Sequence, residues 1–157
     1  MAMKAIDQWF AEYGESHQHP TNKLIHWICV PLITFSVLAL LWELPVPSAM
    51  AEVSPFLNWA VVFALLAGLF YLRLSLPMFV GMGVLSVALL AACYFIERAG
   101  VTLWAVALAV FVGAWIGQFI GHKIEGKKPS FFKDLQFLLI GPAWLLGFIY
   151  KRLGLRY

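Results

Sequence analysis

Charge is scarce in this sequence. Of the 157 residues, 12% are Asp, Glu, Lys or Arg and 62% are hydrophobic, whereas a soluble domain is about a quarter charged. This balance excludes a disordered chain, a nucleic-acid-binding protein and an ordinary water-soluble domain. The N-terminus lacks the continuous apolar core of a signal peptide, because Asp7 and Glu12 interrupt it. The two cysteines, Cys29 and Cys93, both lie in apolar stretches, so we expect buried thiols rather than a disulfide.

What the sequence does contain is a series of long apolar stretches. A helix needs about 20 residues to cross the hydrocarbon core of a bilayer. The segments between the stretches carry prolines and glycines that end helices. The sequence therefore predicts an all-α, integral membrane four-helix bundle that forms one domain over residues 1–157. The predicted spans are about 24–42, 56–73, 77–96 and 101–121.

A fifth apolar block, residues 131–150, contains Gly141 and Pro142 in its middle. It is either a fifth span or a broken, re-entrant element. Lys and Arg concentrate in cytoplasmic loops. If the block does not span, ten of the 11 Lys and Arg residues lie on one side of the membrane and only Arg98 lies on the other. The charge bias therefore favours four spans with both termini in the cytoplasm.

A short amphipathic helix is predicted within residues 1–14, before the first span. Ile6, Trp9, Phe10 and Tyr13 recur there at helical spacing, with polar residues on the other side. This helix either lies in the membrane interface, in contact with lipids, or packs against the protein's own spans.

The fourth span carries a stripe of small residues, Gly113, Gly117 and Gly121, at four-residue spacing. Such a stripe lets a neighbouring helix approach closely. The neighbour is either another span of the same chain or a second copy in a homodimer. The internal contact is favoured, because a four-helix protein must first pack its own helices.

All four histidines stand at the ends of apolar blocks and none in the middle of one: His17, His19, His26 and His122. In the four-span topology they share the cytoplasmic face of the membrane. No pair has the local spacing of an HExxH metal motif. Any site they form must therefore be assembled from segments far apart in the sequence.

Two helix faces bring polar side chains to these histidines. Asn22 precedes His26 by four residues, and Gln118 and Glu125 flank His122 at helical spacing. If the first and fourth spans are neighbours, the two faces meet and form a plausible site for a divalent first-row metal. Neutral imidazole suits Fe, Zn, Cu and Ni, and histidine with carboxylate and open positions suits non-haem Fe(II). The simpler interpretation has interfacial histidines that bind headgroups or water, an interhelical hydrogen bond at Gln118 and an exposed Glu125.

Three stretches resemble the signatures of the Mpo1-like proteins. The first is YGESHQHPTNKLIHWICVP, residues 13–31, and the second is WIGQFIGH, residues 115–122, followed by Glu125 and Pro129. The third is LIGP, residues 139–142. The resemblance covers nearly the whole chain, and its stretches occur in the family's order.

This resemblance implies an Fe(II)-dependent dioxygenase of lipid metabolism. The family's characterised fungal member is an endoplasmic-reticulum enzyme of fatty-acid α-oxidation. From a 2-hydroxy fatty acid and O₂ it yields the fatty acid one carbon shorter. The residues that the resemblance assigns are the metal-binding and catalytic His17, His26 and His122, the further metal ligand Glu125, and the substrate-binding Asn22 and Gln118.

Two features depart from the fungal pattern. His19 stands where the family usually has another residue, so it is either an extra ligand or, as we expect, a surface residue. The chain also lacks the long charged tail of the fungal protein. We expect a bacterial inner-membrane protein, whose activity is assigned by analogy.

Other functions stay open on the sequence alone. Two histidines between helices can hold a haem. A non-catalytic lipid-binding or structural membrane protein needs no metal. The membrane di-iron hydroxylases use about eight histidines, and four are present here. A transporter is disfavoured, because no span carries a charged residue at mid-depth.

Overall fold

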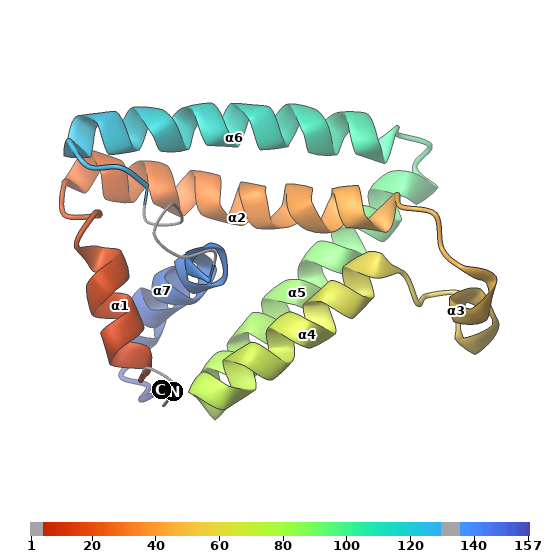
Figure 1. Cartoon of the computed structure of the whole chain (residues 1–157), viewed down its shortest axis with the longest axis horizontal. Coiled ribbons are helices and arrows are strands. Elements are labelled where there is room, and N and C mark those ends of the chain that lie inside the picture. Colours follow the sequence, from red (N-terminus) through yellow and green to blue (C-terminus); the bar gives the residue numbers. More distant parts are fainter. Residues whose placement is uncertain (1–4, 130–135) are drawn as a thin grey trace.

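The computed structural model describes residues 5–129 and 136–157, which fold into seven α-helices and contain no strand (Figure 1). The all-α class is therefore confirmed. The helices are α1 (Ile6–Gly14), α2 (Pro20–Trp42), α3 (Ser48–Val53), α4 (Trp59–Leu74), α5 (Leu76–Arg98), α6 (Leu103–Glu125) and α7 (Phe137–Arg152).

Local sequence sets the beginnings of the long helices. Pro20 occupies the first position of α2, where its missing N–H costs nothing. Asn58 caps α4 by accepting a hydrogen bond from the Val61 N–H at 3.1 Å. Ser75 accepts from the Met78 N–H at the start of α5 in the same way.

The long helices form two antiparallel pairs. α2 lies beside α6, and α4 lies beside α5, with the second pair inclined to the first (Figure 1). α7 packs in the angle between the pairs, and α1 packs against α7. A single four-helix bundle is not confirmed, because the two pairs diverge and a further helix fills the space between them.

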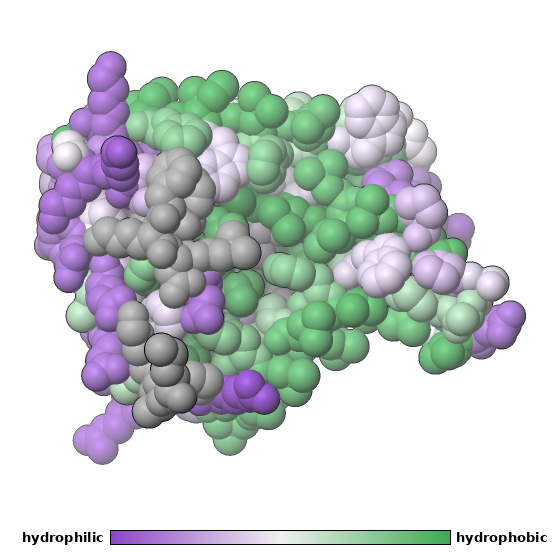
Figure 2. Space-filling view, in the orientation of Figure 1, coloured by the Kyte–Doolittle hydropathy of each residue, from purple (hydrophilic) through white to green (hydrophobic). Residues whose placement is uncertain are grey.

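Three helices are long and apolar enough to cross a membrane: α2, α5 and α6. Each has 23 residues, or roughly 35 Å at 1.5 Å per residue. α4, the expected second span, is apolar but has only 16 residues. Figure 2 shows hydrophobic side chains over the middle of the molecule and hydrophilic ones at its ends. This distribution is that of a membrane protein.

α1 packs on the protein rather than lying apart from it. Its apolar residues Ile6, Trp9, Phe10 and Tyr13 are all buried. The Trp9 ring meets the Phe137 ring of α7 edge-on, with the centroids 5.5 Å apart. Of the two positions expected for the amphipathic helix, the structure shows the packed one.

α7 is one continuous helix through Gly141 and Pro142, so the predicted break at this pair is wrong. Half of the 16 residues of α7 are buried, and packing against several helices stabilises the turn that lacks the Pro142 N–H. The Tyr71 hydroxyl of α4 donates to the Leu139 carbonyl at 2.8 Å. The predicted block begins at residues 131–135, outside the described residues.

The glycine stripe of α6 faces α2. A Cβ atom added at Gly117 would lie 2.7 Å from the Cys29 Sγ, and one added at Gly121 would collide with the Asn22 side chain. At Gly113 nothing lies within 4 Å. Two of the three glycines are therefore occupied by an internal contact, and a homodimer through all three is not supported.

Candidate metal centre

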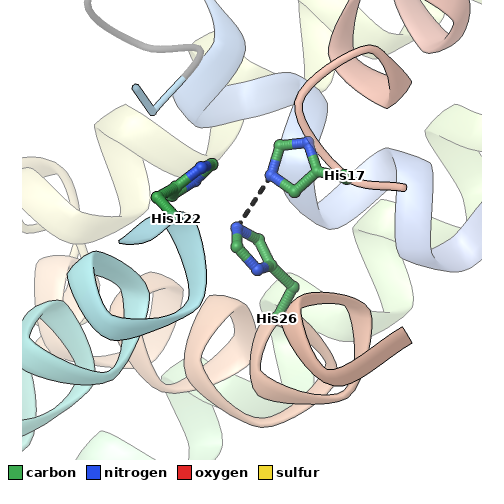
Figure 3. Close-up of side chains that lie close together, drawn as sticks. All are labelled: His17, His26 and His122. Atoms are coloured by element: carbon green, nitrogen blue, oxygen red, sulfur yellow. Dashed lines mark hydrogen bonds between the residues drawn. The ribbon is translucent and has the colours of Figure 1, made fainter. Parts of the chain in front are cut away.

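Three histidines converge at the end of the α2–α6 pair. His17 lies in the segment between α1 and α2, His26 on the second turn of α2, and His122 near the end of α6 (Figure 3). All three are buried, and their ligand nitrogens lie within 4.8 Å of one another. Residues separated by more than a hundred positions thus meet because α2 and α6 are antiparallel neighbours.

Backbone carbonyls orient two of the three rings. His17 Nδ1 lies 2.6 Å from the Tyr13 carbonyl oxygen, and His26 Nδ1 lies 2.9 Å from the Asn22 carbonyl oxygen. A carbonyl only accepts, so each Nδ1 must carry the proton. The two Nε2 atoms then face each other with lone pairs at 2.8 Å. Such a pair is satisfied by a cation, which is the usual arrangement of metal-binding histidines with an anchored second nitrogen.

His17 is held as a neutral imidazole. Its side chain is fully buried, and the Tyr13 ring stacks on it with the centroids 4.1 Å apart. Burial, followed by the effect of the neighbouring His26, lowers the pKa of His17 to about 3. Neutral imidazole is the form that binds metal ions.

His122 completes the cluster from α6. Its ring centroid lies 5.0 Å from that of His17 and 5.0 Å from that of His26. Its Nδ1 is buried and has no hydrogen-bond partner among the described residues. A buried nitrogen without a partner costs about 1–3 kcal/mol, and a coordinated ion would satisfy it. The donor set therefore fits a metal ion on two independent counts.

Glu125 lies beside the cluster, and its carboxylate contacts the segment that follows His17. One oxygen accepts from the Gln18 N–H at 2.8 Å, and the other accepts from the His19 N–H at 2.8 Å and from Asn22 Nδ2 at 3.1 Å. The family resemblance implies a metal ligand here, and that role stays a prediction. In the structure Glu125 has two backbone partners and the Asn22 amide, and the ligand group found among the described residues consists of the three histidines.

The remaining predicted residues take different positions. Asn22 is fully buried, and its Oδ1 has no hydrogen-bond partner among the described residues. Gln118 is buried and lines the same cavity as the three histidines. His19 is exposed and accepts from the Thr21 N–H at the start of α2, so it lies outside the cluster.

Comparison with known proteins identifies the family of this chain. The profile of the family described as 2-hydroxy-palmitic acid dioxygenase Mpo1-like matches residues 3–153. The chain belongs to the Mpo1-like family. It is 31% identical over 142 residues to the 2-hydroxy-palmitic acid dioxygenase MPO1 of Saccharomyces cerevisiae. The matched region covers 88% of this chain and 76% of the yeast protein. No solved structure matches the chain significantly.

The cavity beside the histidines of this Mpo1-like protein is small, about 50 Å³. A haem with two histidine ligands has one on each face of the porphyrin. His17 and His26 cannot take those places, because their Nε2 atoms are only 2.8 Å apart. The arrangement favours a single bare ion over a haem.

Sequence reasoning missed how the rings are oriented. Tyr13 was expected only as part of an apolar face, yet its carbonyl fixes His17. The residue types carry no signal for these contacts, because the acceptors are backbone carbonyls and every histidine has a residue four positions before it. The contacts depend on the path of the backbone and on the orientation of each ring, which only the structure shows.

Proposed function

We propose that this Mpo1-like protein is an Fe(II)-dependent dioxygenase that acts on 2-hydroxy fatty acids and releases the fatty acid one carbon shorter. The observation that supports the proposal best is the pair of anchored imidazoles whose Nε2 atoms face each other at 2.8 Å, with His122 beside them. The yeast relative, a 2-hydroxy-palmitic acid dioxygenase by name, suggests the substrate class.

The residues that would hold the iron are His17, His26 and His122. Imidazole nitrogen suits Fe(II), and three histidines leave positions open for other ligands. When bound, Fe(II) supplies the electron transfer with O₂ that organic side chains lack. The carbonyls of Tyr13 and Asn22 hold two of the rings in position.

The proposed reaction balances without a further reductant. One 2-hydroxy acid and one O₂ give the acid one carbon shorter, one CO₂ and one water. The C1–C2 bond breaks, the substrate loses four electrons and O₂ accepts them. Gln118 is buried in the cavity wall beside His26, and in this proposal its amide would donate to the substrate carboxylate. Val30, Ile33 and Phe137 line the same cavity and keep bulk water from the reacting atoms.

The proposal is tested on the purified protein in detergent. We expect it to retain iron and to convert 2-hydroxypalmitate to pentadecanoate under O₂. His26→Ala and His122→Ala should each lose both properties while still inserting into the membrane. His19→Ala is the matched control and should keep both, because His19 is exposed and outside the cluster.

Three results would contradict the proposal. Full iron retention in both His26→Ala and His122→Ala would show that these histidines do not bind the iron. A wild-type protein that binds fatty acids but neither retains iron nor turns over any 2-hydroxy acid would be a non-catalytic lipid-binding protein. A Soret band would indicate a haem instead.

A further inference from the structure

A second, larger cavity lies between the two helix pairs. Its volume is about 490 Å³, within the usual range of about 300–1,000 Å³ for small-molecule sites. We name it the chain cavity. Its wall is mostly apolar, none of the described residues that line it is charged, and it includes Val37 and Leu38 of α2, Phe63 and Ala64 of α4, and Met82 and Ser86 of α5.

The chain cavity adjoins the histidine cavity. Five residues line both: Ile33, Thr34, Trp115, Leu138 and Pro142. They come from α2, α6 and α7, which meet beside the cluster (Figure 1). A molecule with its polar end at the histidines can therefore continue past these residues into an apolar space.

The direction of the cavity follows from the helices that line it. On α2 it reaches Leu38, and on α6 it reaches Phe111. At 1.5 Å per residue, Leu38 lies about 18 Å along the helix from His26, and Phe111 about 16 Å from His122. The cavity thus leads away from the hydrophilic end of the molecule, between helices with hydrophobic surfaces (Figure 2).

The wall chemistry suits an alkyl chain. The Thr34 hydroxyl is already used, because it donates to the Val30 carbonyl at 2.9 Å. Tyr71 likewise donates to the Leu139 carbonyl. Two of the polar groups in the wall are thus satisfied by the protein. A long unbranched apolar ligand would gain free energy by leaving water for this wall, about 0.8 kcal/mol for each buried CH₂ group.

We propose that the chain cavity holds the acyl chain of the substrate, and that Ala64 and Ser86 set the chain length it accepts. This inference rests on the proposed function, since it places the carboxyl end at the histidines. Ala64 and Ser86 are small, half-buried and on the part of the wall that the histidine cavity does not share. A larger side chain at either position would shorten the available space.

Turnover across a series of chain lengths tests the assignment. Ala64→Phe and Ser86→Leu should lower kcat/KM for 2-hydroxypalmitate relative to 2-hydroxyoctanoate by about tenfold or more, since one methylene in a hydrophobic pocket already changes the ratio about 10- to 200-fold. Phe111→Ala, which lengthens the cavity, should shift preference toward longer chains. Ala88→Leu is the matched control, because Ala88 is exposed on the same helix as Ser86.

The assignment is overturned if the folded variants keep the wild-type chain-length profile. If both filling variants fail to fold, Phe111→Ala decides, and an unchanged preference in it counts against the cavity. If the wild-type protein turns over 2-hydroxypalmitate in these experiments, the proposed function stands whatever the variants do. Failure of the chain-cavity assignment is therefore distinguishable from failure of the proposed function.

A binding experiment makes the test independent of turnover. Palmitate with a terminal diazirine, photolysed on the purified protein in detergent, should label Met82 or Ser86 of α5, which are buried and half-buried in the cavity wall. Excess 2-hydroxypalmitate should suppress that labelling. Labelling only at lipid-facing residues such as Leu65 and Leu66, which are 63% and 61% exposed, with no competition, would overturn the proposal even if the enzyme is active.

Discussion

His17 and His26 are oriented by the same device, a Nδ1–H that donates to the carbonyl four residues earlier. The two carbonyls belong to different elements, so the relative placement of the rings depends on the segment that joins α1 to α2. Glu125 holds that segment, because its two oxygens accept from the consecutive N–H groups of Gln18 and His19. Glu125 is therefore a positioning residue for His17.

Glu125→Gln should weaken iron binding while the helices remain folded. A glutamine offers one carbonyl oxygen and one NH₂ group, so one of the two backbone N–H groups would lose its acceptor. Loss of a partner that orients a metal ligand typically costs about 10- to 100-fold in metal affinity, and we expect an effect on the order of tenfold. Iron content against a graded chelator, read beside circular dichroism, measures it.

Glu52→Gln provides the matched control, because Glu52 is exposed on α3 at the opposite end of the molecule. If Glu125→Gln and the wild type resist the chelator equally, the hydrogen bonds from Gln18 and His19 to Glu125 do not position His17. Equal loss in both variants would show a general effect of charge.

At the scale of elements, the contact between α2 and α6 makes the site. His26 and His122 come from these two helices, and Gly117 and Gly121 let the helix backbones approach. The Asn22 side chain occupies the space beside Gly121. The contact that packs α2 closely against α6 therefore also places the two histidines beside each other.

Gly121→Leu should separate the helices and disrupt the cluster. Overpacking of this kind typically costs about 1–3 kcal/mol, so we expect a lower melting temperature in detergent together with loss of iron. Gly113→Leu is the control on the same helix face, since nothing lies within 4 Å of a Cβ added at Gly113. If Gly113→Leu loses as much stability as Gly121→Leu, the close approach at Gly121 is not what matters.

Sequence patterns were sufficient for features that depend on local chemistry. The apolar runs predicted the long helices, and the four-residue glycine spacing indicated the close contact that α2 and α6 make. The three histidines of the cluster were also selected before any geometry, because their positions and the family signatures agreed. The helices and the glycine stripe are encoded in residues near one another along the chain, and each histidine was selected by the local signature in which it stands.

The remaining features depend on tertiary packing. Pro142 predicted a break, but α7 is half buried and packing holds it continuous. The apolar face of α1 is equally suited to lipid and to protein, and only the position of α7 decides between them. Glu125 has a carboxylate that suits a metal as well as backbone N–H groups, so its partner depends on where residues 18–19 lie.

At the scale of the whole molecule, the two ends of the chain's helices differ in character. The histidine cluster, α1 and the end of α6 gather at one end, whereas α3 and the α5–α6 turn lie at the other (Figure 1). The end of α7 lies near α1 rather than near α3. The charge bias predicts that the histidine end is cytoplasmic and that the fifth block does not cross the membrane.

Cysteine labelling in intact cells tests that topology. Glu52→Cys and Arg98→Cys should react with a membrane-impermeant maleimide, whereas Lys128→Cys and Lys151→Cys should react only after permeabilisation. All four positions are exposed, and the native Cys29 and Cys93 are buried, so the unsubstituted protein gives the background. Labelling of Lys151→Cys together with Glu52→Cys would mean that α7 crosses the membrane, and the charge bias would then have misplaced the C-terminus. Labelling of Lys128→Cys from outside would place the histidine cluster on the outer face and reverse the predicted orientation.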